Sequence, residues 1–179
     1  MHPDLEEILY TEEQIAESVV QLGERLSADY ENKNPLFICV LKGAVLFMAD
    51  LVKQVTVPME MDFMATSSYG ESSKSSGVVR ILKDLEGSVE GRDVVIVEDI
   101  VDTGLTLAYL RDMLLNRRAA SVKVVALFDK PDGRQVDIIP DYYGFTVPNQ
   151  FIVGYGLDFA EKYRNLPYVG VLRREIYTK

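Results

Sequence analysis

Residues 94–106 decide the fold, and they read Val-Val-Ile-Val-Glu-Asp-Ile-Val-Asp-Thr-Gly-Leu-Thr. The four β-branched residues at the start favour a strand buried on both faces of a parallel sheet. In open α/β sheets, ligands bind beyond the carboxyl ends of such strands. Glu98, Asp99 and Asp102 therefore lie where we expect a ligand.

A short turn rich in threonine and glycine, residues 102–106, follows the acidic pair. It offers backbone N–H groups and two hydroxyls, and apolar residues at helical spacing come next. These residues are Leu107, Leu110, Met113 and Leu114. Because backbone amides at a helix N-terminus bind phosphate groups, the turn predicts a phosphate cradle.

The composition restricts the class of protein. At 179 residues the chain suits a single domain, which we place over residues 1–179. A net charge of −9 argues against a nucleic-acid partner, since such proteins use clustered Lys and Arg. The single cysteine, Cys39, lies in an apolar stretch, so we expect a buried thiol and a reducing compartment.

The first residues contain no basic segment followed by an apolar one, and no apolar run approaches the ~18 residues of a membrane span. We therefore expect a cytoplasmic protein without a membrane partner. The one histidine, His2, is near a terminus that we expect to be loosely held, which excludes a His-based triad. Because carboxylates near a phosphate repel it unless a divalent cation intervenes, the acidic residues predict Mg²⁺ as cofactor.

The hydrophobic pattern predicts alternating strands and helices. Thr11 and Gln14 form a capping box for a helix that runs to about residue 28. A strand over 36–41 and a helix over 44–55 follow, and the turn at 102–106 leads into a helix that runs to about residue 116. Further strands are expected over 59–63, 78–82, 122–128, 142–147, 151–153 and 168–172. The pattern predicts an α/β protein whose central sheet is mostly parallel, with helices on both faces.

Residues 66–77 form a polar segment, half of it serine, between two predicted strands. A connection this long is either a solvated loop or a functional lid. Tyr69, an aromatic residue within the serine tract, favours the lid.

Taken alone, an apolar strand that ends in acidic residues also fits a receiver domain or a nucleotide hydrolase. A receiver has its acidic pair near the start of the chain, and no Gly-x-x-x-x-Gly-Lys-Ser/Thr loop of a hydrolase is present. Taken together, the strand, Glu98, Asp99, Asp102 and the turn 103–106 resemble the phosphoribosyl diphosphate signature of the type I phosphoribosyltransferases.

The resemblance extends along most of the chain to the hypoxanthine-guanine phosphoribosyltransferases. It is carried in order by Leu41-Lys42-Gly43, Ser68-Tyr69, Asp129-Lys130, residues 151–158 and residues 162–166. It implies the type I phosphoribosyltransferase fold, with a small hood subdomain and a flexible lid loop that includes Ser68 and Tyr69. One departure is Leu105, where animal members carry Lys and bacterial members commonly have Leu. This departure puts the animal-type regulation and affinity in doubt, but not the activity.

The resemblance also implies roles for individual residues. Asp102 is the general base that accepts a proton from the purine, whereas its alternative role is to cap the following helix. Glu98 and Asp99 hold the ribose hydroxyls and the metal, unless one of them pairs with a nearby cation. The remaining implied contacts are Thr103, Gly104, Leu105 and Thr106 with the 5′-phosphate; Lys42, Gly43 and Arg164 with the diphosphate; Lys130, Phe151 and Ile152 with the purine; and Asp158 with a second Mg²⁺.

These last residues have simpler interpretations as well. Lys130 is alternatively an exposed lysine at a strand end, and Phe151 a core residue. Asp158 and Arg164 are alternatively members of an ordinary surface loop. In the family, the peptide bond corresponding to Leu41–Lys42 is cis, which the sequence by itself does not reveal.

The resemblance therefore implies a purine-salvage enzyme. It transfers the 5-phosphoribosyl group from phosphoribosyl diphosphate to the 6-oxopurines hypoxanthine or guanine, giving IMP or GMP and diphosphate. Its partners are these small-molecule substrates, and its assembly is a homodimer or homotetramer. Two alternatives stay open: a regulator that binds RNA or DNA and keeps the nucleotide site as a sensor, and a receiver-like domain with Asp129 as phosphoacceptor.

Overall fold

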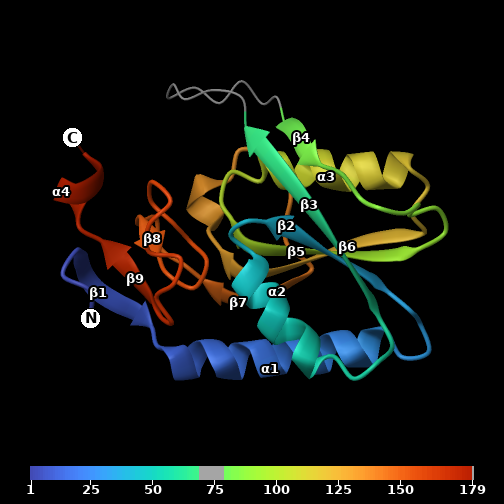
Figure 1. The fold of residues 1–179 in the computed structure, drawn as a ribbon, viewed down its shortest axis with the longest axis horizontal. Helices are drawn as coiled ribbons and strands as arrows, with labels where there is room; N and C mark the ends of the chain where they lie inside the picture. Colours follow the sequence, from blue (N-terminus) through green and yellow to red (C-terminus); the bar gives the residue numbers. More distant parts are fainter. Residues whose placement is uncertain (69–78, 179) are drawn as a thin grey trace.

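The computed structural model describes residues 1–68 and 79–178, in which the strands form two sheets (Figure 1). The larger sheet has the strand order β4-β3-β2-β5-β6-β7, and the smaller one the order β1-β9-β8. The strands are β1 Leu5–Tyr10, β2 Leu36–Leu41, β3 Glu60–Ser68, β4 Val79–Lys83, β5 Asp93–Val101, β6 Ser121–Asp129, β7 Tyr142–Thr146, β8 Ile152–Val153 and β9 Val169–Leu172. The helices are α1 Glu12–Asp29, α2 Val45–Leu51, α3 Leu105–Asn116 and α4 Arg174–Tyr177, with short 3₁₀ helices at Val52–Gln54 and Pro131–Gly133.

The larger sheet contains a reversal of strand order at its centre. Strands β3, β2, β5, β6 and β7 run parallel, and the edge strand β4 is antiparallel to β3. From β2 the chain continues outward to β3, whereas from β5 it continues in the other direction to β6 and β7. The mostly parallel sheet is therefore confirmed, and the reversal between β2 and β5 creates the point where open α/β sheets bind ligands.

Helices cover both faces of the larger sheet (Figure 1). Helices α1 and α2 pack on one face, where Leu22 and Phe47 belong to the same apolar cluster as Val97 of β5. Helix α3 packs on the other face, where Leu110 belongs to a second cluster with Ile96. Successive residues of β5 point to opposite faces, so the apolar residues 94–97 are each buried by one of the two layers.

The capping box at the start of α1 is confirmed. The Gln14 N–H donates to Thr11 Oγ1 at 3.3 Å, and the Thr11 N–H donates to Gln14 Oε1 at 2.9 Å. The predicted helix over 44–55 is shorter than expected, because α2 ends at Leu51 and a 3₁₀ helix completes the segment. No helix within residues 1–68 and 79–178 has both the length and the apolar composition to cross a membrane.

The smaller sheet forms a hood beside the larger one, and it joins the two ends of the chain. Strand β1 was not predicted; it pairs antiparallel with β9, so that Leu5 lies opposite Leu172. The expectation of a loosely held terminus was wrong, because the His2 backbone N–H donates to Tyr168 Oη at 3.0 Å. The local hydrophobic pattern did not predict β1, because the strand that it pairs with, β9, lies more than 150 residues away in the sequence. The predicted strands over 151–153 and 168–172 also belong to this hood.

Candidate active site

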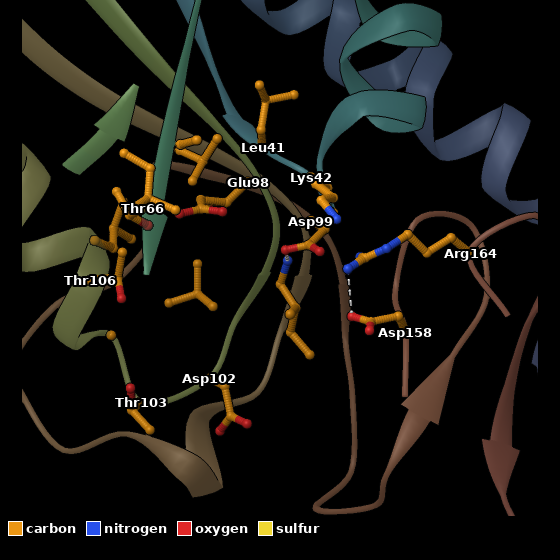
Figure 2. A pocket seen from close by; sticks show the side chains of 18 of the residues that line it. Leu41, Lys42, Thr66, Glu98, Asp99, Asp102, Thr103, Thr106, Asp158 and Arg164 are labelled. Atoms are coloured by element: carbon orange, nitrogen blue, oxygen red, sulfur yellow. Dashed lines mark hydrogen bonds and ion pairs between the residues drawn. The ribbon is translucent and has the colours of Figure 1, made fainter. Parts of the chain in front are cut away.

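A cleft of about 480 Å³ opens at the carboxyl ends of β2 and β5, at the reversal of strand order (Figure 2). The residues predicted to hold ribose, phosphate and diphosphate meet there although they are widely separated in sequence. Those that line the cleft are Lys42, Gly43, Glu98, Asp99, Asp102, Thr103, Gly104, Thr106, Asp158 and Arg164. Thr66, near the end of β3, lines it too and was not predicted.

A second cleft of about 240 Å³ adjoins the first. It is lined by the three predicted purine-contacting residues, Lys130, Phe151 and Ile152. The carboxylates that line both clefts are Asp99, Asp102 and Asp158. Two different molecules, or two parts of one molecule, can therefore meet beside these three carboxylates.

The acidic pair lies within β5, which extends beyond it to Val101. Glu98 is only 8 % exposed, and burial, with a contribution from the charge of Asp99, raises its pKa well above the ordinary value. Burial also raises the pKa of Asp99 to about 6, against the opposing effect of the Ile100 N–H, which donates to Asp99 Oδ1 at 2.7 Å. Among the described residues neither carboxylate forms an ion pair, so the alternative in which one pairs with a nearby cation is not observed.

The turn after β2 is packed directly against the acidic pair. The Leu41–Lys42 peptide bond is cis, as the resemblance implies. A Cβ atom at Gly43 would collide with the Asp99 carboxylate, and one at Gly156, whose φ is +97°, would collide with the Gly43 carbonyl. Glycine is required at both positions because three chain segments meet here without room for a side chain.

The predicted phosphate turn has the expected form. Gly104, with φ +79°, is the N-cap of α3, and no side chain caps this helix. The alternative in which Asp102 caps the helix is therefore wrong. The Leu105 N–H donates to Thr103 Oγ1 at 3.4 Å. Leu105 begins α3, but it is not among the residues that line the cleft.

Asp102 lies at the junction of the two clefts and pairs with Lys130. The Lys130 Nζ is 3.4 Å from Asp102 Oδ2, and the Lys130 side chain is 14 % exposed against 45 % for Asp102. Lys130 is thus not an exposed lysine at a strand end. On the other side of Asp102, Gly133 leaves space for the carboxylate, because a Cβ there would collide with Asp102 Oδ1.

Arg134 is a residue that sequence reasoning missed. Its Nε donates to the Asp102 carbonyl at 3.0 Å and its Nη2 to the Val101 carbonyl at 3.4 Å. It also forms an ion pair with the buried Asp129 and donates to the Ile138 carbonyl. Arg134 therefore joins the phosphate turn to the segment that carries Lys130. No motif identifies it, because three of its partners are backbone carbonyls, whose positions depend on the fold.

Arg164 is held rigidly at the hood side of the first cleft. Its Nη2 is 2.9 Å from Asp158 Oδ1, an ion pair drawn as a dashed line in Figure 2, and its Nη1 donates to the Gly156 carbonyl at 2.7 Å. The Arg164 Nε is buried without a hydrogen-bond partner among the described residues. Asp158 and Arg164 thus line the cleft and are not an ordinary surface loop.

The aromatic residue of the second cleft is partly accessible. Phe151 is 37 % exposed, so it is not a core residue, whereas Ile152 is 7 % exposed. Tyr177 stacks on Phe151 with ring centroids 4.9 Å apart, and Phe159 meets it edge-on at 5.5 Å. The lining of the second cleft includes Phe151 but not Tyr177, so one aromatic surface is presented to a ligand.

The predicted lid lies almost entirely outside the described residues. Ser68 is the last residue of β3, and Tyr69 falls beyond the described part of the chain. The lid therefore stays a prediction.

A glycine-capped turn at residues 102–106, an acidic pair at the switch point of a mostly parallel sheet and a hood beside that sheet together define the type I phosphoribosyltransferase fold. The family model for the phosphoribosyl transferase domain matches residues 6–160. The chain belongs to the phosphoribosyltransferase family.

Similar proteins come from several organisms. A hypoxanthine-guanine phosphoribosyltransferase of Streptococcus thermophilus is 58 % identical over 100 % of this chain and 99 % of its own length. The crystal structure of a Staphylococcus aureus hypoxanthine phosphoribosyltransferase is 45 % identical, with a TM-score of 0.97 over 100 % of this chain and 97 % of that one. A Trypanosoma cruzi hypoxanthine phosphoribosyl transferase is 44 % identical, with a TM-score of 0.94 over 99 % of this chain and 96 % of that one.

Proposed function

We propose that this chain is a purine-salvage enzyme, a single domain over residues 1–179. It transfers the 5-phosphoribosyl group from phosphoribosyl diphosphate to hypoxanthine or guanine, giving IMP or GMP and diphosphate. The observation that carries the proposal is the pair of adjoining clefts, one with a phosphate turn and acidic residues, the other with a lysine and an aromatic ring. The shared carboxylates lie where a sugar and a base held in the two clefts would meet.

In this proposal Asp102 is the general base, because its carboxylate faces both clefts. It accepts the proton that the purine loses as the new bond to the ribosyl carbon forms. Gly133 and the backbone contacts of Arg134 hold the Asp102 segment in place. The paired Lys130 is poised to donate to the 6-oxo group of the purine, which disfavours adenine because its 6-amino group is itself a donor.

The sugar and the phosphates occupy the first cleft. Glu98 and Asp99 accept hydrogen bonds from the ribose hydroxyls, since carboxylates are acceptors only. The N–H groups of Thr103, Gly104, Leu105 and Thr106 receive the 5′-phosphate at the N-terminus of α3. The diphosphate lies against Lys42, Gly43 and Arg164. Phe151 stacks on the purine, Ile152 contacts its pyrimidine edge, and closure of the loop at Ser68 and Tyr69 excludes water.

Mg²⁺ is the cofactor that we propose, and the donors present suit it. Glu98, Asp99 and Asp158 direct hard oxygen ligands into one cleft, where burial and neighbouring carboxylates raise the pKa of Glu98 and Asp99. The described residues hold no preformed cluster of three or more metal ligands. Mg²⁺ is usually held by one or two carboxylates together with substrate phosphates, so such a cluster is not required. When bound, the ion neutralises charge on the leaving diphosphate.

Two further proposals concern the setting of the enzyme. The sole cysteine, Cys39, is a buried free thiol, and burial raises its pKa to about 12. Because free thiols are typical of a reducing compartment, we propose that the protein is cytoplasmic. We also propose a homodimer or homotetramer, which light scattering after size-exclusion chromatography measures directly.

The experiment that tests the activity is a Mg²⁺-dependent assay of diphosphate release with hypoxanthine, guanine and xanthine in turn. Asp102→Asn is expected to lower kcat by roughly 10² to 10⁴ with little change in the KM for phosphoribosyl diphosphate. Asp112→Asn is the matched control, because Asp112 is 71 % exposed on α3. Near-normal turnover of the Asp102 variant would exclude it as the base, and absence of release with every purine would exclude the reaction.

A further inference from the structure

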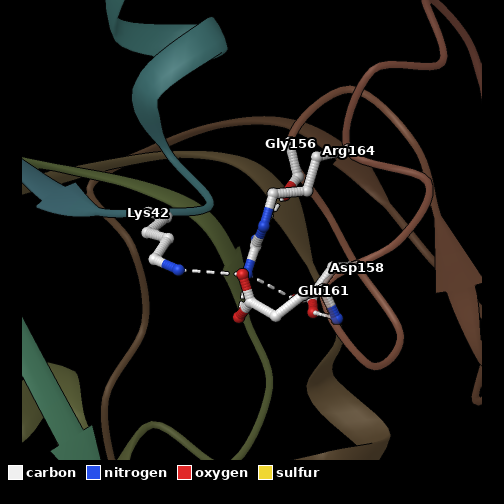
Figure 3. A network of polar contacts seen from close by, with 5 residues as sticks. All are labelled: Lys42, Gly156, Asp158, Glu161 and Arg164. Carbon is white, nitrogen blue, oxygen red and sulfur yellow. Dashed lines mark hydrogen bonds and ion pairs between the residues drawn. The ribbon is translucent and has the colours of Figure 1, made fainter.

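Glu161 lies between the two cations predicted to bind diphosphate (Figure 3). Its Oε2 is 2.8 Å from Lys42 Nζ, and its Oε1 is 3.3 Å from Arg164 Nη2. All three residues line the first cleft. Lys42 follows β2, whereas Glu161 belongs to the hood loop between β8 and β9, so the Lys42–Glu161 pair crosses the cleft.

The backbone conformation of the hood loop holds the Glu161 carboxylate close to the two cations. The Glu161 N–H donates to Asp158 Oδ2 at 2.9 Å. Ala160, Glu161 and Tyr163 all have left-handed backbone angles, with φ of 52°, 63° and 76°. Residues other than glycine rarely adopt this conformation, and it persists where surrounding contacts demand it, often at ligand sites.

The contact is easily broken. The Lys42 and Glu161 side chains are 68 % and 66 % exposed, and ion pairs between exposed side chains are weak. Arg164, by contrast, is 26 % exposed and anchored on the Gly156 carbonyl. Glu161 can therefore move away while Arg164 stays, which leaves the cations accessible to another anion.

We propose that Glu161 occupies, in the ligand-free chain, the place of one diphosphate oxygen and is displaced when diphosphate binds. Glu161 lowers the affinity of the site for diphosphate, both by competing for Lys42 and Arg164 and by repelling the incoming anion. The release of the product diphosphate becomes faster as a result. This inference rests on the proposed function, because it takes these two cations as the diphosphate site.

The opposite role for Glu161 leads to a different result. If its carboxylate joined Asp158 in holding a metal on the diphosphate, then removing its charge would weaken binding. Glu161→Gln keeps the size of the side chain and separates the two roles by the direction of the change in affinity.

The test is calorimetric titration of the full chain with inorganic diphosphate in the presence of Mg²⁺. Glu161→Gln is expected to bind diphosphate roughly three- to tenfold more tightly than the wild type at low salt, and the gain should shrink in 0.5 M salt because exposed pairs are screened. Glu90→Gln is the matched control: it makes the same change in net charge and breaks the exposed Glu90–Arg118 pair, away from the cleft. Its affinity should equal that of the wild type.

Unchanged or weaker binding by Glu161→Gln would overturn the inference while leaving the proposed function intact. Equal tightening in Glu90→Gln would also overturn it, because net charge would then explain the gain. If the wild type bound no diphosphate, then the proposed function itself would fail, and this inference with it.

Discussion

Replacing Asp99 by Asn in the ligand-free, chelator-treated protein is expected to stabilise it at neutral pH and not at acid pH. Burial raises the pKa of Asp99 from 3.8 to about 6. A carboxyl whose pKa is raised by folding supports the folded state fully below its unfolded pKa, and this support is lost as the pH rises through the folded value. At pH 7 the wild type therefore carries an ionised carboxylate that the fold disfavours, and the variant does not.

The size of the effect follows from the two pKa values. Each pKa unit corresponds to about 1.4 kcal/mol, so the free energy of unfolding should differ by up to about 3 kcal/mol at pH 8. For a chain of this length, a difference of 1 kcal/mol moves Tm by about 2–4 °C, so Asp99→Asn should raise Tm by up to roughly 12 °C. The Ile100 N–H keeps an acceptor, because the amide oxygen of Asn replaces Asp99 Oδ1. Loss of the Asp99 charge also removes one of the two causes that raise the pKa of Glu98, and this stabilises the variant in the same direction.

The assay is urea unfolding of wild type and variant from pH 4 to pH 8, with the difference in unfolding free energy plotted against pH. Asp84→Asn is the control of opposite sign, since Arg117 donates two hydrogen bonds to Asp84 at 2.7 Å and lowers its pKa. That variant should be less stable at pH 7 and should keep most of this deficit down to pH 4, because the lowered pKa of Asp84 lies below its ordinary value of 3.8. A pH-independent difference for Asp99→Asn, or a less stable variant at pH 7, would refute the electrostatic reasoning.

Two further predictions concern the segment after β6. Gly133→Ala should lower kcat at least tenfold with Tm nearly unchanged, because the added methyl group displaces the Asp102 carboxylate. Steady-state kinetics and a melting curve measure these two quantities. A normal kcat would show that Asp102 tolerates the displacement. Arg134→Lys should reduce stability by about 1–3 kcal/mol in urea unfolding and lower kcat/KM for phosphoribosyl diphosphate, because lysine cannot replace all the contacts of the guanidinium. An unchanged kcat/KM with reduced stability would limit Arg134 to a structural role.

Much of the local structure was predictable because its causes are local. The capping box at Thr11 and Gln14, the buried strand before Glu98 and the turn at Gly104 each depend on residues within one element and its end. The resemblance added the distant parts of the site, such as Arg164, and the structure brings them to the same cleft.

Other features were not predictable because their partners are far away in sequence. Strand β1 depends on β9 at the opposite end of the chain, and its own charged residues hide the pattern. Arg134 acts on backbone carbonyls, which carry no sequence signal. The contact between Glu161 and Lys42 exists only because the hood loop folds over the end of β2.

The sequence by itself determined the parallel core, the glycine-containing turn at residues 102–106 and the chemical types of the site residues, because strand burial and turn geometry are encoded in neighbouring residues. The tertiary structure alone decided which charges are compensated. Glu98 is buried and Asp99 half-buried, both without an ion-pair partner among the described residues, whereas Asp102 pairs with Lys130 and Arg164 with Asp158. The energy of a charge depends on its distance from other charges and from water, and only the folded chain sets those distances.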